Sequence, residues 1–91
     1  MLIDSTKKMI PMKFDIELGT INRARKFCDY ALELNEDVYI CQGRYTVDGK
    51  SIMGIFSLDF TERMQLQIDE PQDDFYEFFT KIKELGVICI D

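Results

Sequence analysis

The sequence contains no histidine, which removes the commonest general base and the commonest metal ligand among the side chains. Its cysteines, aspartates and glutamates do not show the spacing of a zinc or calcium site. Only three cysteines are present, Cys28, Cys41 and Cys89, and they form no Cys-x-x-Cys pair. We interpret them as small apolar fillers in a reducing cytoplasm. We therefore expect no catalytic residue, no metal and no cofactor, and a protein that is not an enzyme.

Basic runs and long apolar runs are also missing. The net charge is −6, and no stretch gathers Lys and Arg as nucleic-acid binding requires. No apolar run reaches the length of a membrane span, and residues 1–12 do not have the pattern of a signal peptide. We expect a cytoplasmic protein that contacts neither nucleic acid nor a membrane directly.

The residues that are present indicate one compact domain. The length of 91 residues suits a single domain, which we predict over residues 1–91. The apolar fraction of 46% and the charged fraction of 31% are typical of a globular chain rather than a disordered one.

The hydrophobic pattern divides the chain into seven elements. Alternating apolar side chains predict four strands, in residues 9–18, near 38–41, in 45–47 and in 64–68. Helical spacing predicts a helix capped by Thr20 and ending near Asn35, and a short helix over residues 51–58. It also predicts a final helix with Pro71 near its first turn, an apolar stripe from Phe75 to Leu85, and a stop at Gly86. Strands with one apolar face favour an antiparallel sheet with helices on one side. The predicted class is α+β, with the order β-α-β-β-α-β-α.

Two local features stay open at this point. Gly54 inside a short helix costs about 1 kcal/mol relative to alanine, so a close approach by another chain or by another part of the fold must offset that cost. The apolar tail Val87 to Ile90 could form an extra strand, a lid on the core or a contact with another subunit.

The short helix after Lys50 carries apolar residues on two faces. Ile55 and Leu58 can face the core, while Ile52, Met53 and Phe56 form a second apolar face that the same sheet cannot cover. This second face is predicted to be available for a partner. Ser51 precedes the helix and is predicted to cap it, and a phosphate on Ser51 would lie in the favourable field of the first N–H groups.

The segment Lys50-Ser51-Ile52-Met53-Gly54 resembles the regulatory serine segment of the HPr family. HPr proteins are the small phosphocarriers of the bacterial phosphoenolpyruvate:sugar phosphotransferase system. The resemblance covers roughly residues 9–86, includes the order of the elements, and needs no gap between Asp37 and Ser51. It implies an HPr-like open-faced β-sandwich, with three helices on one face of a four-stranded antiparallel sheet.

The resemblance also implies partners. The family's serine is phosphorylated by an HPr kinase in many bacteria, which makes Ser51 the candidate regulatory site. Ile52, Met53 and Phe56 match positions through which the family touches that kinase, phosphotransferase enzymes and a catabolite regulator. Two departures, Phe56 in place of the frequent methionine and Asp59 in place of a small residue, are expected to affect partner choice.

The family's phosphorylated histidine has no counterpart here. It usually lies in a Gly-x-His-x-Arg-Pro pattern at the start of the first helix, where this chain has Gly19-Thr20-Ile21-Asn22-Arg23. Counting from Ser51 places Thr20 at the histidine position, whereas aligning Gly19 places Ile21 there and Arg23 on the arginine. A threonine phosphate is an ester without the transfer potential of a phosphoimidazole. We interpret Thr20 as a cap only. Arg23 is a solvated charge by its chemistry, and we include it with Ile52, Met53 and Phe56 among the candidate partner-binding residues.

Three functions remain as hypotheses. We favour a regulatory protein of the sugar phosphotransferase system, similar to the catabolite-repression HPr, which has likewise lost its histidine and kept its serine. The alternative is an interaction module that is unrelated to sugar transport and uses the same surface. A phosphocarrier with another nucleophile is the hypothesis that the residues support least.

Overall fold

The computed structural model describes residues 12–69 and 73–89. Within them the strands are β1 (Met12–Ile16), β2 (Val38–Gln42), β3 (Tyr45–Asp48) and β4 (Met64–Ile68), and the helices are α2 (Ile21–Leu32), α3 (Ile52–Phe56) and α4 (Phe75–Leu85). This confirms the predicted order. The expected strand residues 9–11, Pro71 and the tail residue Ile90 lie outside the described residues.

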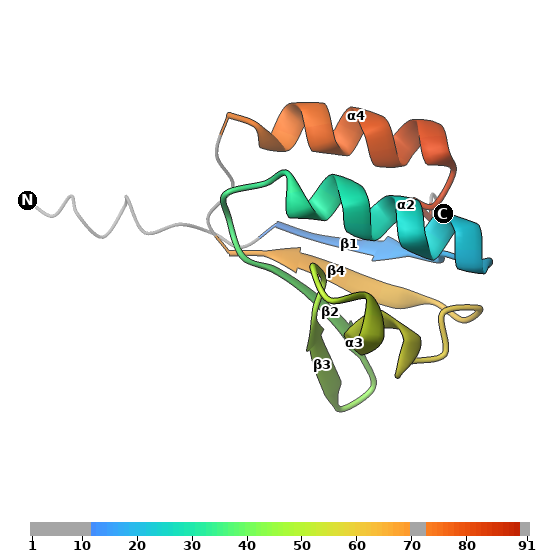
Figure 1. The fold of residues 1–91 in the computed structure, drawn as a ribbon. Helices are drawn as coiled ribbons and strands as arrows, with labels where there is room; N and C mark the ends of the chain where they lie inside the picture. Colours follow the sequence, from blue (N-terminus) through green and yellow to red (C-terminus); the bar gives the residue numbers. More distant parts are fainter. Residues whose placement is uncertain (1–11, 70–72, 90–91) are drawn as a thin grey trace, which may run out of the picture.

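The four strands form one antiparallel sheet in the order β1-β4-β2-β3. Figure 1 shows α2 and α4 side by side over this sheet, with α3 over the part that contains β2 and β3. Phe14, Leu66 and Ile40 lie opposite one another on three neighbouring strands, so apolar side chains share the face that the helices cover. The other face carries the alternate, mostly polar residues of each strand. The predicted α+β open-faced sandwich is confirmed.

The core lies between the sheet and the helices. Phe27 of α2 and Phe78 of α4 are both buried and meet edge to face, with ring centroids 5.8 Å apart and an interplanar angle of 69°. This aromatic contact joins the two long helices. The strands contribute fully buried side chains from below: Ile16, Ile40, Leu66 and Ile68.

The ends of the long helices follow local chemistry. The Thr20 Oγ1 accepts the N–H of Arg23 at 3.1 Å, which confirms Thr20 as the cap of α2. Helix α2 ends at Leu32, three residues before the predicted stop at Asn35, because the chain leaves helical geometry after Glu33. Gly86 ends α4 with φ of 83°, a left-handed conformation that suits glycine.

The C-terminal segment bonds to the edge strand β1 and closes the core. The N–H of Glu17 donates to the carbonyl oxygen of Val87 (2.8 Å), and the N–H of Cys89 donates to that of Asp15 (2.9 Å). Val87 itself is buried. Residues 87–89 therefore form an isolated β-bridge to β1, with Ile88 opposite Ile16, rather than a full extra strand, and Val87 acts as a lid on the core.

Gly54 is explained by a close approach within the same fold. A Cβ atom added at this position would lie 3.3 Å from the Cβ of Val47 on β3. The absence of a side chain lets α3 lie directly against β3.

A second glycine, Gly49, gives a direct test of close packing. Its N–H donates to the carbonyl oxygen of Val38 at 2.7 Å, and an added Cβ would lie 2.7 Å from the Cγ1 of Val38. Gly49→Ala should lower the free energy of unfolding by about 1–3 kcal/mol, as overpacked sites do. Urea unfolding measures this loss.

The neighbouring valine provides the control for Gly49→Ala. If the clash with the Val38 side chain is the cause, the double variant with Val38→Ala should be more stable than the sum of the single losses predicts. Strictly additive losses would contradict the proposed cause.

Candidate protein-docking site

The serine of the regulatory segment lies at the beginning of α3. The Ser51 Oγ accepts the N–H of Gly54 at 3.1 Å, and its own N–H donates to the carbonyl oxygen of Asp48 at 3.0 Å. Ser51 therefore caps the helix as predicted, and its side chain is only half-buried.

Lys50 fixes this segment to α2. Its Nζ donates to the carbonyl oxygen of Leu34 at 2.7 Å, and the Cys28 Sγ donates to the carbonyl oxygen of Lys50 at 3.4 Å. Burial raises the pKa of the Cys28 thiol, and the nearby carboxylates of Asp29 and Asp48 raise it further. The thiol is therefore neutral near pH 7, which is consistent with a packing role rather than a reactive one.

The two faces of α3 have different environments. Ile55 is completely buried and Leu58 is 8% exposed, so these side chains face the core. Met53 is 74% exposed, while Ile52 and Phe56 are half-buried at its sides. Of the outward apolar face predicted from the sequence, Met53 is exposed, whereas Ile52 and Phe56 are partly packed against the core.

Phe60 borders this face, and Ile21 is an exposed apolar residue on the neighbouring helix α2; the sequence indicated neither as part of a partner contact. Phe60 lies in the loop after α3 and contacts Phe56, with ring centroids 5.7 Å apart. Its carbonyl oxygen accepts the N–H of Gly19 at 2.8 Å, which brings the loop to the beginning of α2. Ile21, the first residue of α2, is 53% exposed. We call these five residues the docking surface: Ile21, Ile52, Met53, Phe56 and Phe60.

Phe60 gave a weak sequence signal because it follows the helix in a loop and belongs to no periodic pattern. Ile21 was singled out only as a degenerate position of the phosphorylated histidine. Ile21 has no reactive group, and the Thr20 side chain beside it serves as the cap of α2. Neither position therefore offers a substitute for an imidazole.

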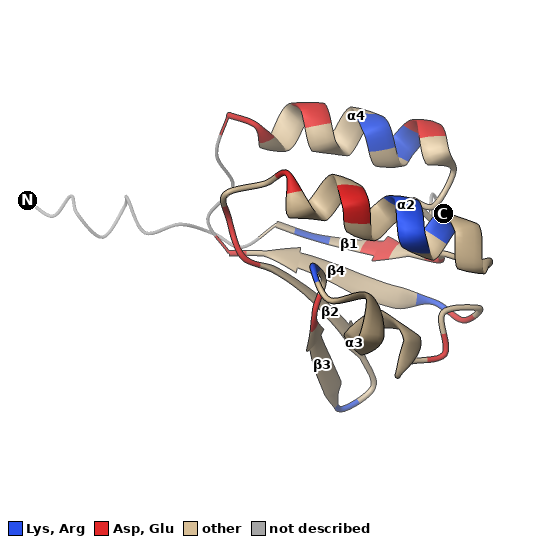
Figure 2. Ribbon diagram, in the orientation of Figure 1, with Lys and Arg blue, Asp and Glu red and all other residues tan. Residues whose placement is uncertain are grey.

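Basic side chains gather in the first half of α2 although the chain is acidic overall. Arg23, Arg25 and Lys26 are exposed in the first half of α2. Figure 2 shows these charges on α2, acidic residues on the second half of that helix, and no charged residue on α3. Arg23 also borders an open hollow of about 390 Å³ together with Glu17, Arg63 and Cys89. We call Arg23, Arg25 and Lys26 the basic margin; with Leu85 of α4 they also line an open hollow of about 470 Å³.

The described part of the chain offers little for other kinds of site. Residues 12–69 and 73–89 hold no group of three or more metal-ligating side chains. In the same residues no helix is both long enough and apolar enough to cross a membrane. The docking surface is accordingly the best-supported candidate among the described residues.

Comparison with known proteins identifies the fold. HPr-C-His from Thermoanaerobacter tengcongensis is similar with a TM-score of 0.62 and 24% sequence identity, over 85% of this chain and 90% of that chain. The phosphocarrier protein HPr from Bacillus anthracis str. Ames is similar with a TM-score of 0.63 and 23% identity, over 85% of this chain and 95% of that chain. The chain has the HPr fold. No protein-family model and no curated protein matches the sequence.

The HPr fold confirms the architecture that the serine segment implied. At this level of identity the likeness establishes the fold alone. The roles of Ser51 and of the docking surface therefore have to be argued from the geometry of the site.

Proposed function

We propose that this chain is a regulatory, protein-binding member of a bacterial sugar phosphotransferase system and not a phosphoryl carrier. The observation that carries this proposal is the exposed apolar face of α3, with Met53 at 74% exposure, on an HPr fold without histidine. An exposed apolar face of this kind is typical of a protein–protein contact. Methionine suits such a contact because its side chain adapts to different partner surfaces.

The carrier function is disfavoured by chemistry at the beginning of α2. The hydroxyl oxygen of Thr20 already accepts a hydrogen bond from the N–H of Arg23. Phosphate on that oxygen would be a stable ester and not a phosphoramidate that passes its phosphoryl group onward. The retained role of this region is therefore recognition, through Ile21 and the basic side chains behind it.

Phosphorylation of Ser51 would act on the docking surface directly. A phosphate adds a charge of about −1.5 to −2 at neutral pH. Ser51 precedes Ile52 and Met53, so this charge would lie beside the apolar side chains that contact the partner. The expected consequence is a change of partner preference on phosphorylation rather than a change of fold.

The basic margin indicates the chemistry of the partner. Arg23, Arg25 and Lys26 favour a partner that surrounds an apolar pocket with acidic side chains. HPr kinase, a phosphotransferase enzyme or a catabolite regulator is the proposed partner.

Incubation with HPr kinase and ATP tests the regulatory proposal. We expect phosphate on Ser51, located by mass spectrometry of proteolytic peptides. Ser51→Ala should abolish the label, and Ser57→Ala should not, because Ser57 lies at the other end of the same short helix. Circular dichroism checks that each variant is folded.

The outcome also separates the alternative functions. Absence of label on folded protein would favour an interaction module unrelated to sugar transport, an alternative supported by the lack of any matching family model. Incubation with phosphoenolpyruvate and the first enzyme of the system should give no acid-labile phosphate. Its appearance and transfer onward would contradict the proposal.

A further inference from the structure

The side chain of Gln42, at the end of β2, bonds to the loop that follows α3. Its Nε2 donates to the carbonyl oxygen of Asp59 at 2.8 Å, and its Oε1 accepts the N–H of Asp59 at 2.9 Å. Nε2 also lies within 3.4 Å of the carbonyl oxygen of Arg63. The amide thus makes with Asp59 the reciprocal pair of hydrogen bonds that a residue of a neighbouring strand would make.

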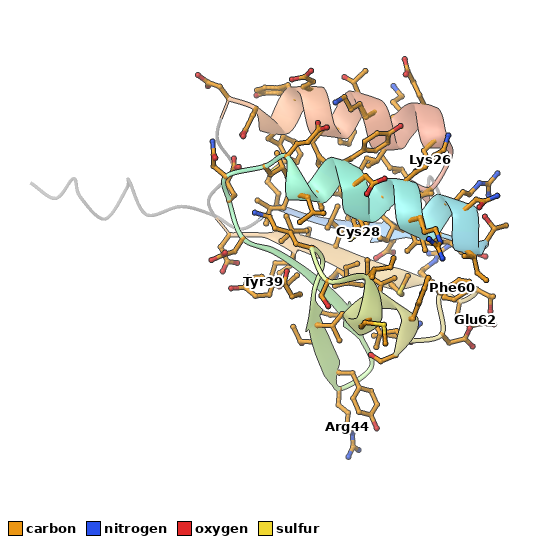
Figure 3. The ribbon with its side chains drawn as sticks, in the orientation of Figure 1. Lys26, Cys28, Tyr39, Arg44, Phe60 and Glu62 are labelled. Atoms are coloured by element: carbon orange, nitrogen blue, oxygen red, sulfur yellow. The ribbon has the colours of Figure 1, made fainter. Side chains whose placement is uncertain are left out.

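The same loop is tied to the rest of the fold on its other side. Phe60, the residue after Asp59, accepts the N–H of Gly19 at 2.8 Å and packs its ring on Phe56. Figure 3 shows Phe60 near the first turns of α2, beside α3. Within the loop, the Asp59 Oδ1 accepts hydrogen bonds from the N–H and the hydroxyl of Thr61 at 3.1 and 2.6 Å. Gln42 and Gly19 therefore hold two adjacent residues of one turn.

We propose that Gln42 is a positioning residue of the docking surface. It fixes the loop at residues 57–63 and thereby determines the position of Phe60. Gln42 does not itself belong to the docking surface; it acts through the backbone of Asp59. The link to docking rests on the proposed function, whereas the clamp on the loop is a property of the fold. Residues 57–63 contain no helix or strand of their own. The side-chain hydrogen bonds of Gln42 therefore take the place of the backbone hydrogen bonds that a helix or strand would provide.

Gln42→Met tests the clamp because methionine keeps the length of the side chain and removes its hydrogen bonds. The informative signal is the amide of Gly19, which bonds to Phe60 and not to Gln42. We expect its hydrogen exchange to become about tenfold to hundredfold faster, as the loss of one or two ordinary hydrogen bonds implies. The amides of β4 should exchange as in the wild type.

Gln65→Met is the matched control, because Gln65 is another half-buried glutamine and lies on the neighbouring strand β4. It should leave the exchange at Gly19 unchanged. Equal acceleration in both variants, or no acceleration in Gln42→Met, would overturn the proposal.

Gln42→Glu adds a pH dependence that a general loss of stability would not produce. A protonated carboxyl group can donate its O–H to the carbonyl oxygen of Asp59 and accept the N–H, as the amide does. The ionised form can only accept, and it would face the carbonyl oxygens of Asp59 and Arg63. The amide chemical shifts of Gly19 and Phe60 should match the wild type at low pH and depart from it as the carboxyl group ionises.

The wild type is titrated in parallel. Its chemical-shift changes give the contribution of Asp59 and of the other carboxylates, which is subtracted from that of the variant. Wild-type shifts in Gln42→Glu at every pH would contradict the clamp. These readouts need no partner. Unchanged exchange at Gly19 in Gln42→Met, with normal labelling of Ser51 in the wild type, would refute this inference alone. Faster exchange in Gln42→Met, with no labelling of Ser51 in the wild type, would refute the proposed function alone.

Discussion

Met53→Glu should weaken binding to the first enzyme of a phosphotransferase system at least about tenfold, because it places a charge where apolar contact is required. Met53 is 74% exposed, so in the free protein the introduced carboxylate lies in water. The free energy of unfolding should therefore stay within about 0.5 kcal/mol of the wild type. Isothermal titration calorimetry measures the affinity, and urea unfolding measures the stability.

Tyr76→Glu is the matched control for this prediction. Tyr76 is also 74% exposed, but it lies on α4 and outside the docking surface. Its replacement should leave the affinity unchanged. An equal loss in both variants would indicate a general effect of added negative charge, and an unchanged affinity in Met53→Glu would exclude the docking surface as the contact with that enzyme.

The elements of this fold could be predicted because their signals are local. The cap at Ser51 depends on a contact with Gly54, three residues away, and the strands show their buried faces by alternation. The exposed face of α3 followed from a simple count of apolar positions on a short helix. Each of these inferences needs only a few neighbouring residues.

The surroundings of the site could not be predicted because they depend on distant segments. Gln42 and Asp59 are 17 residues apart and meet only after β2 and β4 have paired. The loop that carries Phe60 is held at the beginning of α2 by a hydrogen bond with Gly19, far away in the sequence. The basic margin is similar: the net charge of −6 hides three cations that lie close together in the first half of α2.

The tail illustrates a prediction that stayed undecided for a physical reason. From the sequence, an apolar segment such as Val87 to Ile90 is equally compatible with a strand, a lid on the core or a subunit contact. The structure favours the lid, because the side chain of Val87 enters the core, while the backbone makes only an isolated β-bridge with β1.

Phe27→Ala should be the most damaging single substitution for stability among those considered. Phe27 is completely buried, and its ring meets Phe78 across the contact between α2 and α4. Truncation of a buried phenylalanine costs about 3–5 kcal/mol through lost apolar burial and the cavity left behind. A small domain has a total stability of about 5–15 kcal/mol, so this loss is a large share of it. Urea unfolding should show the midpoint of the transition at a much lower urea concentration than in the wild type.

Leu32→Ala on the same helix is the control, because Leu32 is 57% exposed. Its loss should be about 0.5 kcal/mol or less, as at most surface positions. Similar losses at both positions would contradict the burial assigned to α2. Since α2 also carries Ile21 and the basic margin, Phe27→Ala should reduce stability and binding together, whereas Met53→Glu should reduce binding alone. That contrast separates the residues that stabilise the fold from the residues that bind the partner.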